Sequence, residues 1–149
     1  MIGSNHFSLV VICHLTDKTK ETVVIHLDSL GAQSTCHPKD RIQRTLRELI
    51  GAFDEDFQRA HFFTPEVPQQ KDVVSCGLFV LTFLHFFLHA SPSHITMEGG
   101  EVKAHNVTEG HTNFLKLDWF SLANALKMRA YMRWVRGMGG MTCGSGGRV

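Results

Sequence analysis

This sequence lacks most of the compositional features that directly indicate a class of protein. Its four cysteines, at positions 13, 36, 76 and 143, form no C-x-x-C pair and no regular spacing. This excludes a dense disulfide scaffold and favours free thiols in a reducing compartment. Positive and negative side chains nearly cancel, to a formal net charge of +1. Neither nucleic acid nor an anionic membrane is therefore expected as a partner.

Long hydrophobic runs are also missing. The longest, residues 77–88, is shorter than the roughly 20 residues that a membrane-spanning helix needs, and it contains His85. The first residues lack the charged-then-apolar order of a secretory signal peptide. The sequence therefore predicts an intracellular protein without a membrane partner.

No metal motif accompanies the ten histidines. The sequence has no HExxH and no Cys/His cluster. His85 and His89 share one face of a predicted helix, but they offer only two of the ligands that zinc requires. Histidines packed at the end of a buried helix are the simpler interpretation, and a zinc site there is the alternative. We expect no metal.

Strand-like and helix-like segments follow one another in the first half, which indicates an α+β protein. Residues 6–15 and 21–28 are β-branched runs around a polar loop, typical of an antiparallel hairpin with its tip near Asp17. Both faces of each strand are apolar, so we expect cover on both sides. A helix is predicted over 39–53, facing a core with Ile42, Leu46, Leu49, Ile50 and Phe53.

The second half continues this pattern. Residues 54–75 are predicted to be a connection with one short strand near Val67. Residues 76–89 are apolar all round, which indicates a central buried helix. Residues 91–111 are predicted to form a polar surface loop. The next helix spans 121–135 and carries Leu122, Leu126, Ala130 and Trp134. We expect one domain, residues 1–136, and a flexible glycine-rich tail, 137–149.

The hairpin brings two reactive side chains together. His6 and Asp28 are equally far from a tip at Asp17, so the hairpin places them opposite each other. A base oriented by an acid is two thirds of a nucleophilic triad. Taken alone, such a cross-strand pair is more often a structural contact.

Cys76 is the candidate nucleophile. With Ser75 as N-cap it lies in the first turn of the buried helix, where unpaired N–H groups and the helix dipole favour a thiolate. Gly77 leaves room for a substrate backbone. Gln70 precedes the cysteine by six residues and can donate its amide N–H to a developing oxyanion. Taken alone, these features are more often an inert buried cysteine and a polar turn.

Four segments in order carry a family resemblance. HFSLVVI, IHLDSLG, VPQQ and SCGLFVL closely resemble the active-site blocks of the Ulp-type, or sentrin-specific, SUMO protease family. The family's usual forms are H-W-S-L, L-D-S-L, P-Q-Q and D-C-G. The order His, Asp, Gln, Cys is also the family's order. Asp118-Trp119-Phe120 ahead of a helix looks like plant members, and the resemblance runs from about His6 to Arg133.

The resemblance implies a papain-like (adenain/Ulp-type) cysteine protease fold, in which a central sheet packs on a buried helix that starts at the nucleophile. It makes Cys76 the nucleophile, His6 the base, Asp28 its orienter and Gln70 the oxyanion donor. Substrate-binding positions are Phe7, Gln69, Ser75 and Gly77. The implied activity is cleavage after the C-terminal Gly-Gly of SUMO, in precursors or conjugates, in the nucleus and without a cofactor.

The sequence departs from the family pattern at three places. Phe7 replaces a tryptophan that roofs the substrate channel, and Ser75 replaces an aspartate. Only five residues precede His6, where the family has a sizeable segment, so we expect an N-terminally truncated catalytic domain. Two alternatives stay open: an inactive remnant that binds a ubiquitin-like protein, and a protease for another ubiquitin-like modifier.

Overall fold

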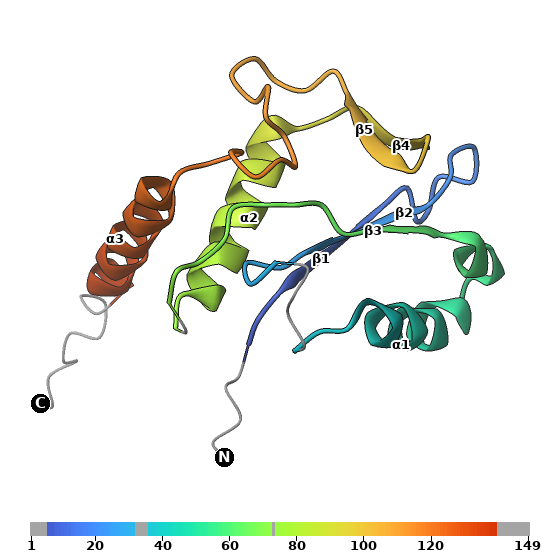
Figure 1. The fold of residues 1–149 in the computed structure, drawn as a ribbon, viewed down its shortest axis with the longest axis horizontal. Coiled ribbons are helices and arrows are strands. Elements are labelled where there is room, and N and C mark those ends of the chain that lie inside the picture. Colours follow the sequence, from blue (N-terminus) through green and yellow to red (C-terminus); the bar gives the residue numbers. More distant parts are fainter. Residues whose placement is uncertain (1–5, 32–35, 73, 140–149) are drawn as a thin grey trace, which may run out of the picture.

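The computed structural model describes residues 6–31, 36–72 and 74–139. They contain helices together with two antiparallel hairpins, which confirms the α+β class (Figure 1). The elements are β1 (Leu9–Cys13), β2 (Val23–Leu27), α1 (Lys39–Gly51), the 3-10 helix η1 (Glu55–Arg59), β3 (His61–Phe63), α2 (Cys76–Ala90), β4 (His94–Glu98), β5 (Glu101–His105) and α3 (Leu122–Gly139).

β2 is the central strand of the main sheet. The strand order is β1-β2-β3, with β1 antiparallel and β3 parallel to β2. Side chains alternate between the two faces of a strand, so Ile25 and Val24 belong to different cores. Every residue of β2 is buried, because both faces of the strand are covered as its apolar sequence predicts.

Each face of the sheet is covered by its own layer. Phe79 and Phe83 of α2 pack on the face that carries Ile25, together with the β4–β5 hairpin. Phe57 of η1 packs with apolar side chains of α1 against Val24 on the opposite face. The sheet is therefore held between two layers, and α2 is fixed along the strands that carry the predicted site.

The β1–β2 hairpin forms in a different register from the prediction. Leu9 pairs with Leu27, so the centre of the hairpin is Lys18 rather than Asp17. Each β1 residue therefore pairs with a β2 residue two positions later in the sequence than predicted. The connection is a wide loop that includes His14 at a left-handed φ of 62°, not a tight turn. A shift by an even number of residues leaves each side chain on its predicted face.

Two predictions for the connecting segments are wrong. The short strand is β3, not the segment near Val67, which is buried but outside any strand. Within the predicted surface loop 91–111 lies the antiparallel hairpin β4–β5. Its turn, Gly99-Gly100, has φ values of 62° and 86°, the left-handed conformation of a tight hairpin turn. A polar, histidine-rich composition hid this hairpin from the sequence prediction.

The burial of side chains on α1 and α2 also differs from the prediction. α1 ends at Gly51, so Phe53 lies beyond it and is 93% exposed. Leu49 is exposed as well, while Leu46 and Ile50 pack against the core as predicted. α2 is buried on one face only, because Leu88 on the other face is 66% exposed. The prediction of a helix buried all round is therefore wrong for α2.

α3 presents its predicted apolar face to solvent. Leu122, Leu126 and Trp134 are exposed, and the helix is buried through Ala125 instead. α3 also continues through residues 137–139, the start of the predicted tail. The rest of that tail, residues 140–149, lies outside the described residues. Among the helices described, none combines the length and the apolar character needed to cross a membrane.

Candidate active site

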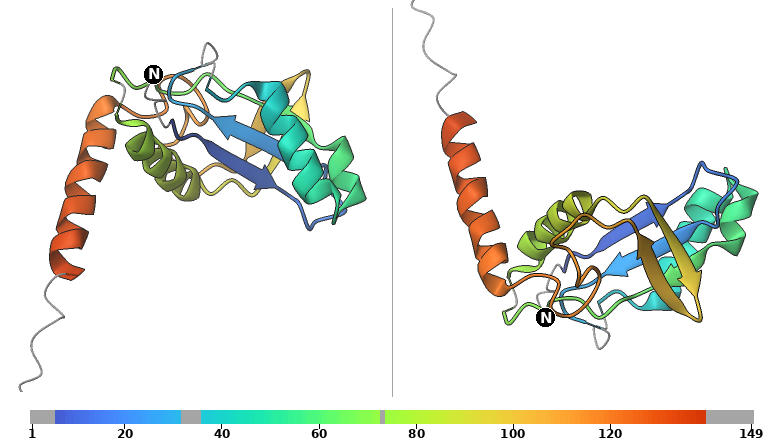
Figure 2. Two further views of the ribbon diagram at one scale, coloured as in Figure 1. Left: turned by 90° about the horizontal axis from the view of Figure 1, so that it is seen from below. Right: turned by 90° about the horizontal axis from the view of Figure 1, so that it is seen from above.

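Three segments that carry the predicted site residues meet at one end of the sheet. β1 begins and β2 ends at this end, because the two strands are antiparallel. The views in Figure 1 and Figure 2 show that α2 also begins there. The backbone N–H of Gln70 donates to the carbonyl of Ser29 at 2.9 Å, which fixes the segment ahead of α2 to the end of β2.

His6 and Asp28 form a buried pair. His6 Nε2 lies 2.7 Å from Asp28 Oδ1, and the two side chains are only 4% and 2% exposed. The backbone N–H of Leu30 donates to the same carboxylate oxygen at 2.8 Å, which holds the carboxylate in place. Because Nε2 faces the acid, Nδ1 is the ring nitrogen left to exchange a proton with another group. The geometry is that of a base oriented by an acid.

Two further histidines surround this acid, and the sequence prediction missed both. His37 Nδ1 lies 3.8 Å from Asp28 Oδ2, and the rings of His37 and His6 are 5.1 Å apart. The ring of His26 meets that of His37 edge-on. Burial lowers the pKa of His26, and the charge of Asp28 opposes this only in part. His37 precedes α1 with no motif around it, so its approach to Asp28 follows from the fold alone.

The side chain of Gln70 is held at both ends of its amide. Ser29 Oγ donates to Gln70 Oε1 at 2.6 Å, and Gln70 Nε2 donates to the backbone carbonyl of Asp72 at 2.5 Å. The amide nitrogen therefore points toward the turn that leads into α2. An NH₂ group has two donors, so the second N–H can serve a ligand while the first keeps this contact. Ser29 was not predicted as part of the site.

Cys76 is the first residue of α2 and is 5% exposed. Ser75 occupies the N-cap position but makes no side-chain capping bond, which corrects the prediction for this residue. The carboxylate of Asp72 instead accepts the backbone N–H groups of Val74 and Ser75. It also accepts the Ser75 hydroxyl, the largest cause of a lowered Asp72 pKa. Arg129 of α3 donates to the same hydroxyl at 3.1 Å.

The sequence profile described as Ulp1 protease family, C-terminal catalytic domain, matches residues 1–121, most of the chain. The chain belongs to the Ulp1 protease family. The buried His6–Asp28 pair and Cys76 at the start of α2 both lie within the matched residues.

Three relatives from Arabidopsis thaliana illustrate the relationship. "Probable ubiquitin-like-specific protease 2B" is 30% identical over 86% of this chain and 15% of its own length. "Ubiquitin-like-specific protease 1C" is 32% identical over 62% of this chain and 19% of its length. "Probable ubiquitin-like-specific protease 2A" is 29% identical over 85% of this chain and 17% of its length. The chain thus spans less than a fifth of these relatives, and no solved structure matches it significantly.

The predicted substrate-binding residues differ in exposure in this Ulp1-family chain. Phe7, next to His6, is 57% exposed and can offer its ring to a ligand. Gln69 is exposed, and its amide lies where a Cβ on Gly31 would come, at a residue whose left-handed φ of 74° favours glycine. No atom lies within 4 Å of the position that a Cβ on Gly77 would take. The space beside Gly77 is therefore open, and a role of this glycine in substrate binding stays a prediction.

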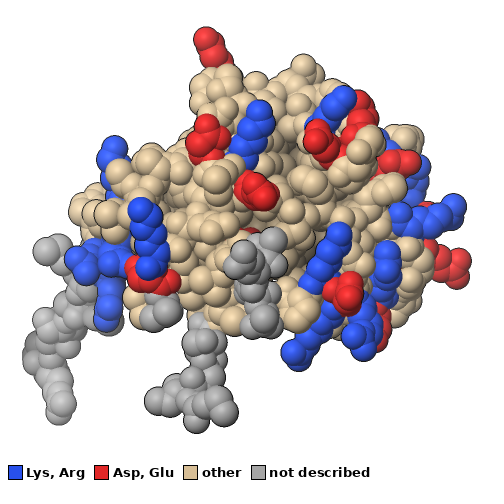
Figure 3. Space-filling view, in the orientation of Figure 1, with Lys and Arg blue, Asp and Glu red and all other residues tan. Residues whose placement is uncertain are grey.

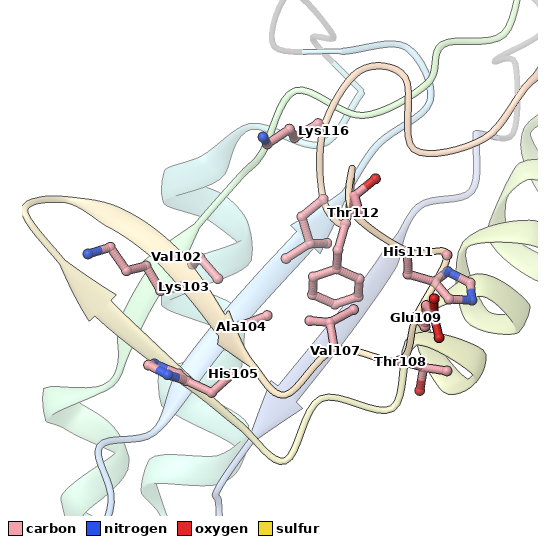
Figure 4. A pocket seen from close by; sticks show the side chains of 13 residues that line it. Val102, Lys103, Ala104, His105, Val107, Thr108, Glu109, His111, Thr112 and Lys116 are labelled. Atoms are coloured by element: carbon pink, nitrogen blue, oxygen red, sulfur yellow. The ribbon is translucent and has the colours of Figure 1, made fainter.

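A pocket of about 550 Å³ lies away from this site, between β5 and residues 107–116 (Figure 4). None of the predicted site residues lines it. On the face shown in Figure 3, acidic and basic side chains are interspersed over several elements. Since none of the reactive side chains lines the pocket, the candidate active site is the end of the sheet that carries His6 and Asp28, where α2 begins with Cys76, and not this pocket.

Proposed function

We propose that this chain is a cysteine protease that cleaves after the C-terminal Gly-Gly of SUMO, in precursors and in conjugates in the nucleus, with residues 1–136 as its catalytic domain. The observation that carries the proposal is the buried His6–Asp28 pair, 2.7 Å apart, at the end of the sheet where α2 begins with Cys76. The family membership and the ubiquitin-like-specific relatives support a protease for ubiquitin-like proteins in general. SUMO is the specific substrate that we infer from the active-site blocks.

The reaction follows from the roles of the side chains. His6 takes the proton of the Cys76 thiol through Nδ1, since Nε2 is held by Asp28. The thiolate attacks the carbonyl of the terminal glycine, and the Gln70 amide and the Cys76 backbone N–H stabilise the oxyanion. His6 then returns the proton to the leaving amine, and the C–N bond breaks to give a thioester. Water hydrolyses the thioester and releases SUMO and the free thiol.

The proposal is tested with a SUMO protein that carries an electrophile at its C-terminus. We expect one covalent adduct at Cys76, found by mass spectrometry, and faster labelling by the SUMO probe than by a matched ubiquitin probe. An adduct with a different ubiquitin-like protein, and none with SUMO, would assign the chain to another modifier. Binding of SUMO without any adduct would favour the inactive remnant.

The contacts of Gln70 yield a second prediction. Gln70→Ala should lower turnover by about 10²-fold or more, the size of losing one oxyanion donor. Ser29→Ala should lower it by about 10-fold, because the amide loses the hydrogen bond that sets its direction. The loss should fall on kcat with KM unchanged, since neither side chain is needed to hold SUMO on the surface.

A double variant separates positioning from a general structural effect. If Ser29 acts through Gln70, Ser29→Ala should cost nothing further in the Gln70→Ala background. A full additional loss in the double variant would show that Ser29 acts by another route. Ser93→Ala, at an exposed serine outside the site, is the matched control.

A further inference from the structure

Three metal-ligand side chains converge at the end of the sheet that carries the His6–Asp28 pair. Ligand atoms of His6, Asp28 and His37 all lie within 4.8 Å of one another. In the part of the chain that the structure describes, this is the one group of three or more such residues. Its members come from three separate segments: His6 lies three residues before β1, Asp28 directly follows β2, and His37 lies two residues before α1.

Two of these atoms have unmet bonding capacity. Asp28 Oδ2 and His37 Nδ1 are both buried, and neither has a hydrogen-bond partner among the described residues. Asp28 as a whole is 2% exposed, so its second carboxylate oxygen is an unpartnered polar atom aimed into the group. A buried polar atom without a partner is costly, and a bound cation is one way to satisfy it.

The spacing also fits a tetrahedral cation. Ligand atoms around tetrahedral zinc stand about 3.3–3.6 Å apart, given metal–ligand bonds of about 2.0–2.2 Å. Here His6 Nε2 lies 2.7 Å from Asp28 Oδ1, and His37 Nδ1 lies 3.8 Å from the other oxygen, Asp28 Oδ2. One imidazole thus faces each carboxylate oxygen, and a cation between them would draw the His6 ring away from its hydrogen bond with Oδ1. The side chain of His37 is 30% exposed and is the member of the group most accessible to solvent.

We propose that His6, Asp28 and His37 form a binding site for a divalent transition-metal cation of the Zn²⁺ class. Two imidazoles and one carboxylate are a ligand set that zinc takes with a fourth position left for water. The other histidine clusters are poorer candidates, since His85–His89 and His94–His105 each bring two rings together without a buried acid.

The site would make the protease sensitive to metal, a consequence that rests on the proposed function. A cation on His6 Nε2 takes the ring out of its hydrogen bond with Asp28. It also leaves the ring proton on Nδ1, the nitrogen that must accept the proton of the Cys76 thiol. Bound metal and an active His6 therefore exclude each other, so zinc would act as an inhibitor and not as a cofactor.

The test measures metal binding and not proteolysis, so its outcome is independent of the proposed activity. Cys76→Ser removes the thiol as a competing ligand, and zinc binding to this variant is measured by calorimetry. Co²⁺, with visible absorption that reports a tetrahedral site, is the second probe. We expect one strong site in Cys76→Ser, weakened about 100-fold or more when His37→Gln removes a ligand.

The matched control is His94→Gln in the same Cys76→Ser background, which alters a two-histidine pair and should leave the strong site intact. Far-ultraviolet circular dichroism checks that each variant is folded. Equal zinc affinity with and without His37, loss of the site in His94→Gln, or no tetrahedral Co²⁺ spectrum in Cys76→Ser would each overturn the proposal.

Discussion

Replacing Cys76 with serine is expected to abolish cleavage of SUMO substrates and adduct formation with the SUMO probe. A hydroxyl is almost wholly protonated at neutral pH, so the variant lacks the ionised nucleophile that the thiol supplies. Serine is close in size to cysteine and tolerates the start of a helix, so the fold should stay intact. Single-turnover cleavage of a SUMO precursor, followed over hours, measures the loss.

The other described cysteines provide the controls for this experiment. Cys36 is exposed, and Cys36→Ser should keep full activity. Cys13 lies on β1, where burial raises its thiol pKa to about 11 and keeps it protonated at neutral pH. If some cleavage remains in Cys76→Ser and is lost when Cys36→Ser or Cys13→Ser is added, the nucleophile is not the cysteine of α2.

The His6–Asp28 contact could be predicted from the sequence, although the predicted pairing was two residues out of register. The contact survives because an even shift keeps side chains on the same face, and because an imidazole can reach a diagonal neighbour. The start of α2 at Cys76 was predictable for a different reason. Apolar residues fill most of the positions after it, and a serine with a preceding turn marks the boundary.

The parts that sequence reasoning missed depend on contacts between distant segments. Ser29 and Gln70 are 41 residues apart, and no local pattern shows that the hydroxyl of one orients the amide of the other. No motif surrounds His37, so no local pattern shows that its ring lies near the carboxylate of Asp28. β3 is three residues long and pairs in parallel with β2, which leaves no alternation to detect.

The largest effect after loss of the nucleophile should come from the His6–Asp28 pair. His6→Ala removes the general base, and a loss of about 10³-fold in kcat/KM is expected. Asp28→Ala should cost nearly as much, because a free His6 ring turns away from the thiol and loses the charge that stabilises its protonated form.

The double variant His6→Ala/Asp28→Ala decides whether the two residues act as one unit. If Asp28 acts only through His6, as their 2.7 Å contact indicates, the double variant should be no slower than His6→Ala alone. His61→Ala, at an exposed histidine beside Glu21 and outside the site, is the matched control and should keep wild-type turnover. Losses that multiply in the double variant would mean that Asp28 contributes independently of His6, for example by holding the Leu30 backbone and the turn after β2.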